Sequence, residues 1–249
     1  WDISTTSYLN KFDITSLISC FSGGAPLPPE ACKQFEAKSG AVIFEGYGLN
    51  ETAPVASANP TDKASRQIGS IGFPIPGTDI KILDLETGSS EMPQGEDGEI
   101  AISGPQVMKG YWQRPEETDK VMTDGGWLRT GDVAIMTEDG FFKIVDRKKD
   151  MILVSGFNVY PNEIEEVTVA HPGILEAAAV GRPNEKSGEV VVLYAVRNDP
   201  NLTKEELLVH LKENLTGYKV PREIIFREEL PKTNVGKILR RELRDEAKN

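Results

Sequence analysis

Two glycine-containing clusters near the start of the chain have the residue types and spacing of a nucleotide-binding edge. They are Ser22-Gly23-Gly24-Ala25-Pro26 and Glu45-Gly46-Tyr47-Gly48-Leu49-Asn50-Glu51. Each follows an apolar segment that is typical of a buried strand. Glycines at the carboxyl end of a strand let the backbone approach a flat ligand, and α/β sheets bind nucleotides at that edge. A plain strand-to-helix turn explains the first cluster equally well, because such short motifs give many false matches.

Three side chains of the second cluster suit three separate tasks. The ring of Tyr47, between two glycines, can lie flat against a base. The amide of Asn50 can donate to a phosphate. The carboxylate of Glu51 can hold Mg²⁺, which prefers one or two carboxylates together with phosphate oxygens. A glycine-rich turn with an exposed acid is the alternative, and the glycine cluster upstream favours function.

Alternating elements must position these clusters. The pattern predicts a strand at residues 17–21, a helix at 29–38 and a strand at 41–45, which together form an α/β layer over residues 1–67. Short strands with turn residues between them follow at 79–85, 99–103, 133–136 and 141–145. They predict a small, strongly bent sheet or barrel over residues 68–147.

The last hundred residues have a third pattern, that of a separate small α+β domain at residues 148–249. It predicts a helix at 161–171 that begins at Pro161, strands at 176–180 and 190–197, and a helix after Thr203. Thr203 and Glu206 have capping-box spacing, and Gly217 is expected to close that helix in the left-handed region. The charged run at residues 146–150 is the predicted boundary between the domains.

Composition and charge restrict the class of protein. The chain has 249 residues, a net charge of −11 and no apolar run near the ~20 residues of a membrane span. An acidic surface repels nucleic acid, so no nucleic-acid partner is expected. The two cysteines, Cys20 and Cys32, predict buried thiols in a reducing compartment. The first residue, Trp1, lacks the features of a start or a signal peptide, which predicts a fragment.

The carboxyl end is locally basic. Residues 230–249 contain six basic and three acidic side chains. A terminal helix with solvated basic side chains explains Arg240, Arg241, Arg244 and Lys248. Lys237, after the flexible turn in Leu230-Pro231-Lys232-Thr233-Asn234-Val235-Gly236, requires separate treatment.

The chain resembles the adenylate-forming enzymes, which include acyl-CoA ligases, luciferases and peptide-synthetase adenylation domains. The resemblance starts at the second glycine cluster and continues through Trp127-Leu128-Arg129-Thr130-Gly131-Asp132, Val145-Asp146-Arg147, Ser155-Gly156-Phe157-Asn158-Val159-Tyr160-Pro161 and Gly236-Lys237-Ile238. It implies a truncated adenylate-forming fold. It also implies that Gly23, Gly24, Ala25, Pro26, Gly46, Tyr47, Gly48, Leu49, Asn50, Asp132 and Arg147 bind ATP or AMP.

The resemblance also implies individual roles. Asp132 accepts the ribose hydroxyls of ATP, Arg147 contacts the ribose and the adenylate phosphate, and Lys149 is the hinge. Lys237 is the adenylation lysine, a mobile cation that bridges the negative charges brought together when a carboxylate attacks a phosphate. The segment with Ser155, Gly156 and Phe157 lies near coenzyme A during thioester formation. The segment from Gly98 to Trp112 matches the family and is interpreted as structural.

The longest similar segments, at residues 144–165, 216–222 and 236–244, resemble bacterial long-chain fatty acid–CoA ligases. The implied substrates are a fatty acid, ATP and coenzyme A, with Mg²⁺ at Glu51, in the cytoplasm. Peripheral membrane association of the whole enzyme and a homodimer are left open. A fatty acyl–AMP ligase, a peptide-synthetase-type domain and a catalytically silent binding fragment are the alternatives.

Two features depart from the family pattern. Asn50 stands where the family has Thr, so the hydroxyl that contacts the phosphate is absent. The Ser/Thr/Gly-rich loop that wraps the β- and γ-phosphates has no counterpart in the sequence. We therefore expect that this polypeptide alone does not make acyl-CoA.

Overall fold

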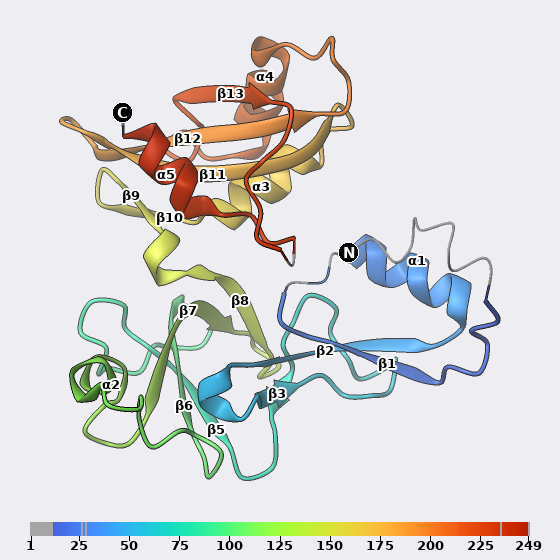
Figure 1. Cartoon of the computed structure of the whole chain (residues 1–249), viewed down its shortest axis with the longest axis vertical. Coiled ribbons are helices and arrows are strands. Elements are labelled where there is room, and N and C mark those ends of the chain that lie inside the picture. Colours follow the sequence, from blue (N-terminus) through green and yellow to red (C-terminus); the bar gives the residue numbers. More distant parts are fainter. Residues whose placement is uncertain (1–11, 26, 28, 235, 249) are drawn as a thin grey trace. The chain divides into compact units, whose positions relative to one another are not determined.

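The structure is a computed structural model that describes residues 12–25, 27, 29–234 and 236–248. The chain divides into two compact units at the bond between Ile144 and Val145, called here unit 1 and unit 2 (Figure 1). Pro26, predicted to bind nucleotide, lies outside the described residues. Among the described helices, none combines the length and the apolar character needed to cross a membrane.

Unit 1 begins with a four-stranded sheet. Its strand order is β1-β2-β3-β4, with bounds β1 (Ser19–Ser22), β2 (Val42–Gly48), β3 (Val55–Ala58) and β4 (Phe73–Pro74). β1 and β2 are parallel and are joined by helix α1 (Pro29–Ser39), which lies along one face of the pair (Figure 1). The buried Cys32 and Phe35 lie one helical turn apart. The predicted strand, helix and strand are confirmed, and β2 continues through the second glycine cluster.

A second four-stranded sheet lies in unit 1, except for the last three residues of its strand β8, which belong to unit 2. Its strand order is β5-β6-β7-β8, with bounds β5 (Asp79–Leu83), β6 (Gly98–Ser103), β7 (Leu128–Met136) and β8 (Phe142–Arg147), and the short helix α2 (Pro115–Val121) precedes β7. Ile82, Ile100 and Phe142 lie in its core, which also includes Ala56 of β3. Within the described strand pairs, the outer strands β5 and β8 are not paired with each other, so the sheet is open and the predicted barrel is wrong.

Unit 2 is a mixed sheet with helices on both faces. Strands β10-β9-β12-β11 are neighbours in that order and β13 pairs with β12. The bounds are β9 (Ile152–Val154), β10 (Phe157–Val159), α3 (Pro161–Val169), β11 (Ile174–Asn184), β12 (Gly188–Arg197), α4 (Lys204–Asn214), β13 (Glu223–Arg227) and α5 (Arg240–Ala247).

The apolar run in β12 is explained by burial on both faces. Val191, Leu193 and Ala195 pack in one core with Leu207 and Leu211 of α4. The alternate residues Val192, Tyr194 and Val196 pack in a second core with Leu243 and Ala247 of α5. Side chains alternate between the faces of a strand, so a strand covered on both faces reads as a continuous apolar run.

Local signals at helix ends were partly correct. Pro161 is the first residue of α3, and the capping box of α4 is present, with Glu206 N donating to Thr203 Oγ1 over 3.2 Å. The prediction for Gly217 is wrong, because the described glycines with a positive φ do not include it. Helix α4 ends instead at Leu215, whose extended backbone places its side chain in the core.

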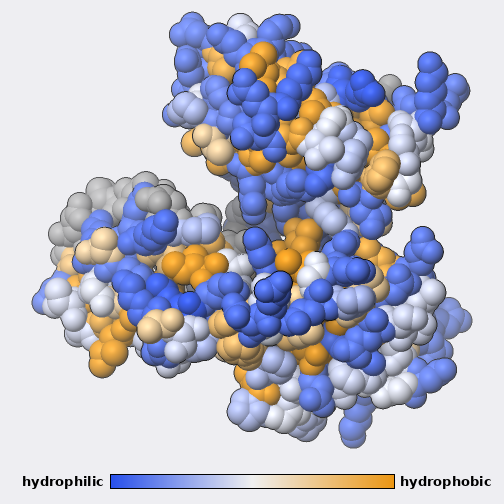
Figure 2. Space-filling model, turned by 180° about the vertical axis from the view of Figure 1, so that it is seen from behind, coloured by the Kyte–Doolittle hydropathy of each residue, from blue (hydrophilic) through white to orange (hydrophobic). Residues whose placement is uncertain are grey.

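The prediction of a solvated terminal helix is wrong for two of its four basic side chains. The side chains of Arg240 and Arg244 are 20% and 28% exposed and pair with acidic groups of unit 2. That of Arg241 is 90% exposed, as expected. Both cysteines are free; Cys32 is buried and Cys20 is half-buried. Figure 2 shows mainly hydrophilic side chains on the visible surface of each unit, in keeping with the net charge of −11.

Candidate functional site

The two glycine clusters lie side by side at one edge of the first sheet. Ser22 of β1 is in register with Glu45 of β2, and the strands are parallel, so the first cluster leaves β1 beside the point in β2 where the second cluster begins. A Cβ on Gly23 would lie 3.2 Å from Gly46 O, and one on Gly46 would lie 2.2 Å from the ring of Phe21. A side chain at Gly46 would displace the ring of Phe21, and the glycines leave an edge with little side-chain bulk.

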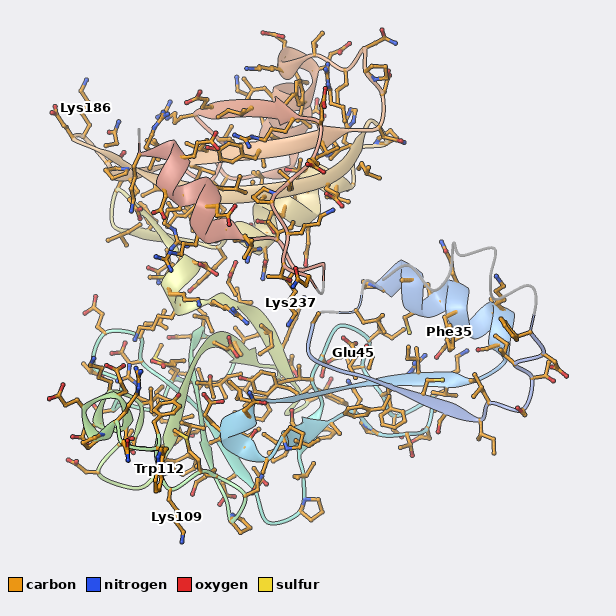
Figure 3. All side chains as sticks on the ribbon, in the orientation of Figure 1. Phe35, Glu45, Lys109, Trp112, Lys186 and Lys237 are labelled. Carbon is orange, nitrogen blue, oxygen red and sulfur yellow. The ribbon has the colours of Figure 1, made fainter. Side chains whose placement is uncertain are left out.

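Glu45 is a half-buried acid beside this edge (Figure 3). Its carboxylate accepts a hydrogen bond from Gly69 N over 3.0 Å. Burial raises the pKa of Glu45 above its ordinary value, and hydrogen bonds from the Gly69 and Leu27 backbones oppose that increase. Glu45 therefore helps to anchor the loop at Gly69 to the edge of the sheet.

The loop after β2 is fixed by its own polar groups. Thr52 is fully buried, and its Oγ1 accepts from Leu49 N over 2.9 Å. A Cβ on Gly48 would lie 1.6 Å from Pro54 O, so only glycine fits against the returning backbone. A short 3₁₀ turn (Asn50–Thr52) results, which leaves Asn50 exposed and Glu51 half-buried.

Tyr47 and Asp132, 85 residues apart in the sequence, are in direct contact. The Tyr47 hydroxyl donates to Asp132 Oδ2 over 2.6 Å. The backbone N–H of Asp132 donates to Thr130 Oγ1 over 3.1 Å, and Gly131 has a φ of 75°. The structure therefore places the residue predicted to contact the base beside the residue predicted to accept the ribose hydroxyls.

Glu99 holds the turn before Asp132, a role that the sequence did not reveal. Its Oε1 accepts from Gly131 N over 3.0 Å. Its Oε2 accepts from Arg129 Nη2 over 2.6 Å and from Arg129 Nε over 3.1 Å. Glu99 is only 4% exposed, so this bidentate pair and the backbone bond satisfy an otherwise costly buried charge.

Tyr111 holds Glu51, which the sequence also did not reveal. The Tyr111 hydroxyl donates to Glu51 Oε1 over 2.8 Å, and this hydrogen bond raises the pKa of Tyr111. Met108 N donates to Glu51 O over 2.8 Å. The segment from Gly98 to Trp112, interpreted as structural, thus fixes two predicted functional residues, Glu51 and Asp132. In the sequence, only its match to the family pattern pointed to this segment.

The fit of Glu51 to Mg²⁺ follows from this contact. Tyr111 donates to Oε1, and the carboxylate keeps acceptor sites on both oxygens for a cation. Within the described residues, no group of three or more acidic, histidine or cysteine side chains gathers as a metal site. A single carboxylate fits a Mg²⁺ ion that keeps most of its ligands from phosphate and water.

In unit 2, the predicted ribose and hinge residues lie around a short 3₁₀ turn (Lys148–Asp150). Arg147 and Lys149 are both exposed. Asp146, beside them, is buried, and its Oδ1 accepts from Arg147 N over 2.6 Å. Burial raises the pKa of Asp146. The backbone of the exposed Arg147 is therefore fixed by a buried carboxylate.

The segment predicted to lie near coenzyme A forms the tip of the β9–β10 hairpin. Ser155 and Gly156 have φ values of 53° and 85°, as in a tight turn with two left-handed residues. The ring of Phe157 stacks on that of Tyr218, with centroids 4.7 Å apart.

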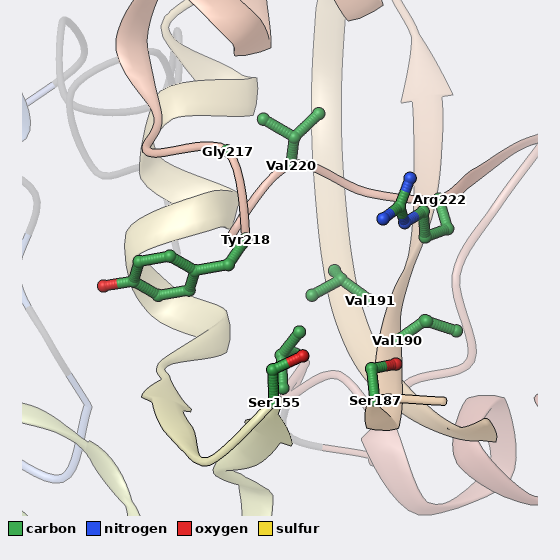
Figure 4. Close-up of a pocket in the computed structure, with 9 residues that line it drawn as sticks. Ser155, Ser187, Val190, Val191, Gly217, Tyr218, Val220 and Arg222 are labelled. Atoms are coloured by element: carbon green, nitrogen blue, oxygen red, sulfur yellow. The ribbon is translucent and has the colours of Figure 1, made fainter. Parts of the chain in front are cut away.

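A small cavity of about 90 Å³ lies next to this tip (Figure 4). Ser155 and Ser187 line one side, and Ser155 N donates to Ser187 O over 2.7 Å. Tyr218 and Arg222, from the loop between α4 and β13, also line the cavity. The cavity beside the predicted thioester-forming segment is therefore lined by hydroxyl-bearing, basic and aromatic residues.

Lys237 lies at the exposed end of the loop that precedes α5 (Figure 3). Its backbone N–H donates to Thr233 Oγ1 over 3.1 Å, and its carbonyl accepts from Thr233 N over 2.8 Å. Unit 1 therefore holds the glycine clusters, Glu51 and Asp132, whereas unit 2 holds Arg147, Lys149, the hairpin tip and Lys237.

Two family models match the chain. The AMP-binding enzyme model matches residues 4–112, and the AMP-binding enzyme C-terminal domain model matches residues 163–237. A long-chain-fatty-acid–CoA ligase of Escherichia coli O6:H1 is 53% identical over 96% of this chain. The chain spans 42% of the length of that relative.

Solved structures share the fold over almost the whole chain. ATP-bound MatB from Rhodopseudomonas palustris matches 92% of this chain with a TM-score of 0.86 and 37% identity, over 45% of its own length. The amide bond synthetase McbA from Marinactinospora thermotolerans matches 100% of this chain with a TM-score of 0.87 and 34% identity, over 50% of its own length. The chain belongs to the adenylate-forming superfamily of AMP-binding enzymes.

Proposed function

We propose that this chain is the nucleotide- and thiol-handling part of a long-chain fatty acid–CoA ligase. The hydrogen bond between Tyr47 and Asp132 carries the nucleotide part of the proposal, because it unites the two motifs at a glycine-lined strand edge. The fatty acid part is supported by the 53% identity to a long-chain-fatty-acid–CoA ligase.

In the first reaction, unit 1 binds ATP. The edge at Gly23, Gly24 and Gly46 admits the flat base beside Tyr47, and Asp132 accepts the ribose hydroxyls. Asn50 donates its amide toward the phosphates from the exposed 3₁₀ turn. A fatty acid carboxylate then attacks the α-phosphate, pyrophosphate leaves, and acyl-AMP forms.

Charge is the main barrier to this attack, because a carboxylate approaches a polyphosphate. Lys237 supplies a mobile cation and Arg147 a second positive charge near the adenylate phosphate. Glu51 would hold Mg²⁺, which would neutralise charge on the phosphate oxygens when it is bound with ATP. Tyr111 keeps the carboxylate of Glu51 in place.

In the second reaction, the thiol of coenzyme A attacks the acyl carbon and AMP leaves. Rotation of the residues after Lys149 would bring the hairpin tip of Ser155, Gly156 and Phe157 to the acyl-adenylate. Two features of the chain stay predictions: the domain boundary after Arg147 and the hinge at Lys149. Two properties of the whole protein also stay predictions: a homodimer and peripheral membrane association.

The test uses the full-length protein and this 249-residue chain in parallel. With ATP, Mg²⁺, palmitate and coenzyme A, we expect palmitoyl-CoA and AMP from the full-length protein and no acyl-CoA from the chain. Product that stops at palmitoyl-AMP, or that forms only with a carrier protein, would favour a fatty acyl–AMP ligase.

Calorimetry with AMP and ATP distinguishes the silent binding fragment. We expect the chain to bind AMP, because the Tyr47–Asp132 pair is complete in unit 1. Absence of binding to either nucleotide by both the chain and the full-length protein would contradict the proposed function.

A further inference from the structure

The loop that carries Lys237 is closed at its base. Lys232 and Ile238 form an antiparallel β-bridge, and Leu239 N donates to Pro231 O over 2.8 Å. Leu230, before the loop, is buried in the second core of unit 2, and Ile238 packs against that core. The exposed lysine is therefore carried by a loop whose two ends are fixed.

Arg240, three residues after Lys237, attaches this loop to helix α3. Its guanidinium donates to Glu165 over 3.0 Å and 2.6 Å, and its Nη2 also donates to Asn162 Oδ1 over 2.6 Å. The side chains of Arg240 and Glu165 are only 20% and 14% exposed. A bidentate ion pair with little exposure to solvent fixes both the orientation of the guanidinium and its distance from the carboxylate.

Asn162 continues the connection to the boundary between the units. Its Nδ2 donates to Val145 O over 2.9 Å, and its backbone N–H donates to Asp146 Oδ2 over 2.8 Å. Val145 is the first residue of unit 2. A continuous set of hydrogen bonds thus runs from the boundary through Asn162 and Arg240 to the base of the Lys237 loop.

We infer that Asn162 and Arg240 are positioning residues for adenylation, which hold the Lys237 loop in a fixed relation to the first residues of unit 2. This inference rests on the proposed function. Val145 and Asp146 precede the proposed hinge at Lys149, so the hydrogen bonds from Asn162 hold the residues after the hinge, and the Lys237 loop with them, in one orientation for adenylation. These bonds must break when the residues after Lys149 turn for the second reaction. Misplacement of a catalytic group by about 1 Å can cost about 10²-fold in rate.

Two conservative variants of the full-length protein separate the two halves of this connection. Asn162→Asp keeps the acceptor for Arg240 and removes the donor to Val145 O. Arg240→Lys keeps the charge and removes the planar fork. Arg241→Ala is the matched control, because Arg241 is the next residue of α5 and its side chain is 90% exposed.

We expect both variants to lower the maximal rate of ATP–pyrophosphate exchange on the order of 10-fold, with KM for ATP unchanged. Thioester formation from supplied palmitoyl-AMP should stay within about 2-fold of the unaltered protein, since Lys237 acts only in the first reaction. Arg241→Ala should behave as the unaltered protein in both assays. If either variant does not fold, Glu165→Gln, which removes the charge and one of the two acceptor oxygens that Arg240 uses, takes its place.

Unchanged exchange rates in the variants would overturn the inference and leave the proposed function intact. Equal losses in both reactions, together with a lower melting temperature, would also overturn it, because they indicate a purely structural role. No exchange by the unaltered full-length protein would defeat the proposed function, and the inference with it.

Discussion

The predicted functional groups of the two units are held in different ways. In unit 1, the carboxylates of Asp132 and Glu51 each accept a hydrogen bond from a tyrosine hydroxyl. In unit 2, Lys237 is placed through its backbone and through ion pairs at the base of its loop. Unit 1 therefore presents preorganised acceptors, whereas unit 2 presents a cation whose accuracy depends on a more distant framework.

The largest expected effect comes from removal of the cation itself. Lys237→Ala in the full-length protein should slow ATP–pyrophosphate exchange by roughly 10²–10³-fold, by analogy with the loss of one preorganised transition-state donor. Thioester formation from supplied acyl-AMP should persist. Lys248→Ala, at the end of α5, is the control. An unchanged exchange rate would remove Lys237 from adenylation.

Gly48→Ala tests the rigidity of unit 1. The added Cβ would lie 1.6 Å from Pro54 O, a backbone atom that cannot move alone. We expect the free energy of unfolding to fall by about 1–3 kcal/mol, measured by urea denaturation of the chain. Gly217→Ala is the control, because a Cβ there meets nothing within 4 Å. Equal stability of the two variants would show that the loop after Gly48 is not rigid.

Loss of single hydroxyls should have smaller and selective effects. Tyr47→Phe should raise KM for ATP and Tyr111→Phe should raise the Mg²⁺ requirement, each by about 0.5–1.5 kcal/mol or roughly 2- to 10-fold. Steady-state exchange assays of the full-length protein measure both. Tyr218→Phe, in unit 2, should leave both values unchanged. Equal changes of KM for ATP and of the Mg²⁺ requirement in Tyr218→Phe would contradict the assignment of nucleotide and Mg²⁺ binding to unit 1.

The smallest expected effect is a pH dependence within unit 2. Burial raises the pKa of Asp146 above 3.8, so its ionised form lowers the free energy of unfolding above the raised pKa. That penalty disappears as the pH falls toward 3.8. Hydrogen bonds from Thr203 lower the pKa of Glu206 below 4.5, so its stabilisation is present above 4.5 and is lost as the pH falls through the lowered pKa.

Asp146→Asn should therefore remove a gain in stability on acidification, and Glu206→Gln should remove a loss. Urea denaturation of the chain between about pH 6 and pH 3 gives the two slopes, whose signs follow from proton linkage. For each variant, its free energy of unfolding is subtracted from that of the unaltered chain at each pH. Slopes of the same sign for the two variants would contradict the opposite effects assigned to Asp146 and Glu206.

The sequence predicted what local patterns determine. The Thr203–Glu206 capping box lies within one turn, and the parallel strands before the glycine clusters are consecutive in the sheet. Arg240 and Arg244 were misjudged as solvated, because their partners Glu165 and Asp150 lie 75 and 94 residues away.

The same limit applies to the site. Tyr111 meets Glu51 across 60 residues and Arg129 meets Glu99 across 30, and no local periodicity encodes such contacts. The prediction that Gly217 closes α4 is wrong for another reason. Leu215 is buried with an extended backbone, so α4 ends there without a left-handed residue. Residue types thus identified the groups that carry chemistry, while the groups that hold them became visible only in three dimensions.

The two-faced sheet of unit 2 has a consequence for how the protein is made. The core with α3 and α4 can close once β13 has left the ribosome, because it includes Ile224, but the opposite face waits for Leu243 and Ala247 of α5. Until α5 is synthesised, Val180, Val192 and Tyr194 lack their cover, and such transiently exposed apolar surface favours aggregation. This face therefore stays uncovered until the residues after Lys237 have been synthesised.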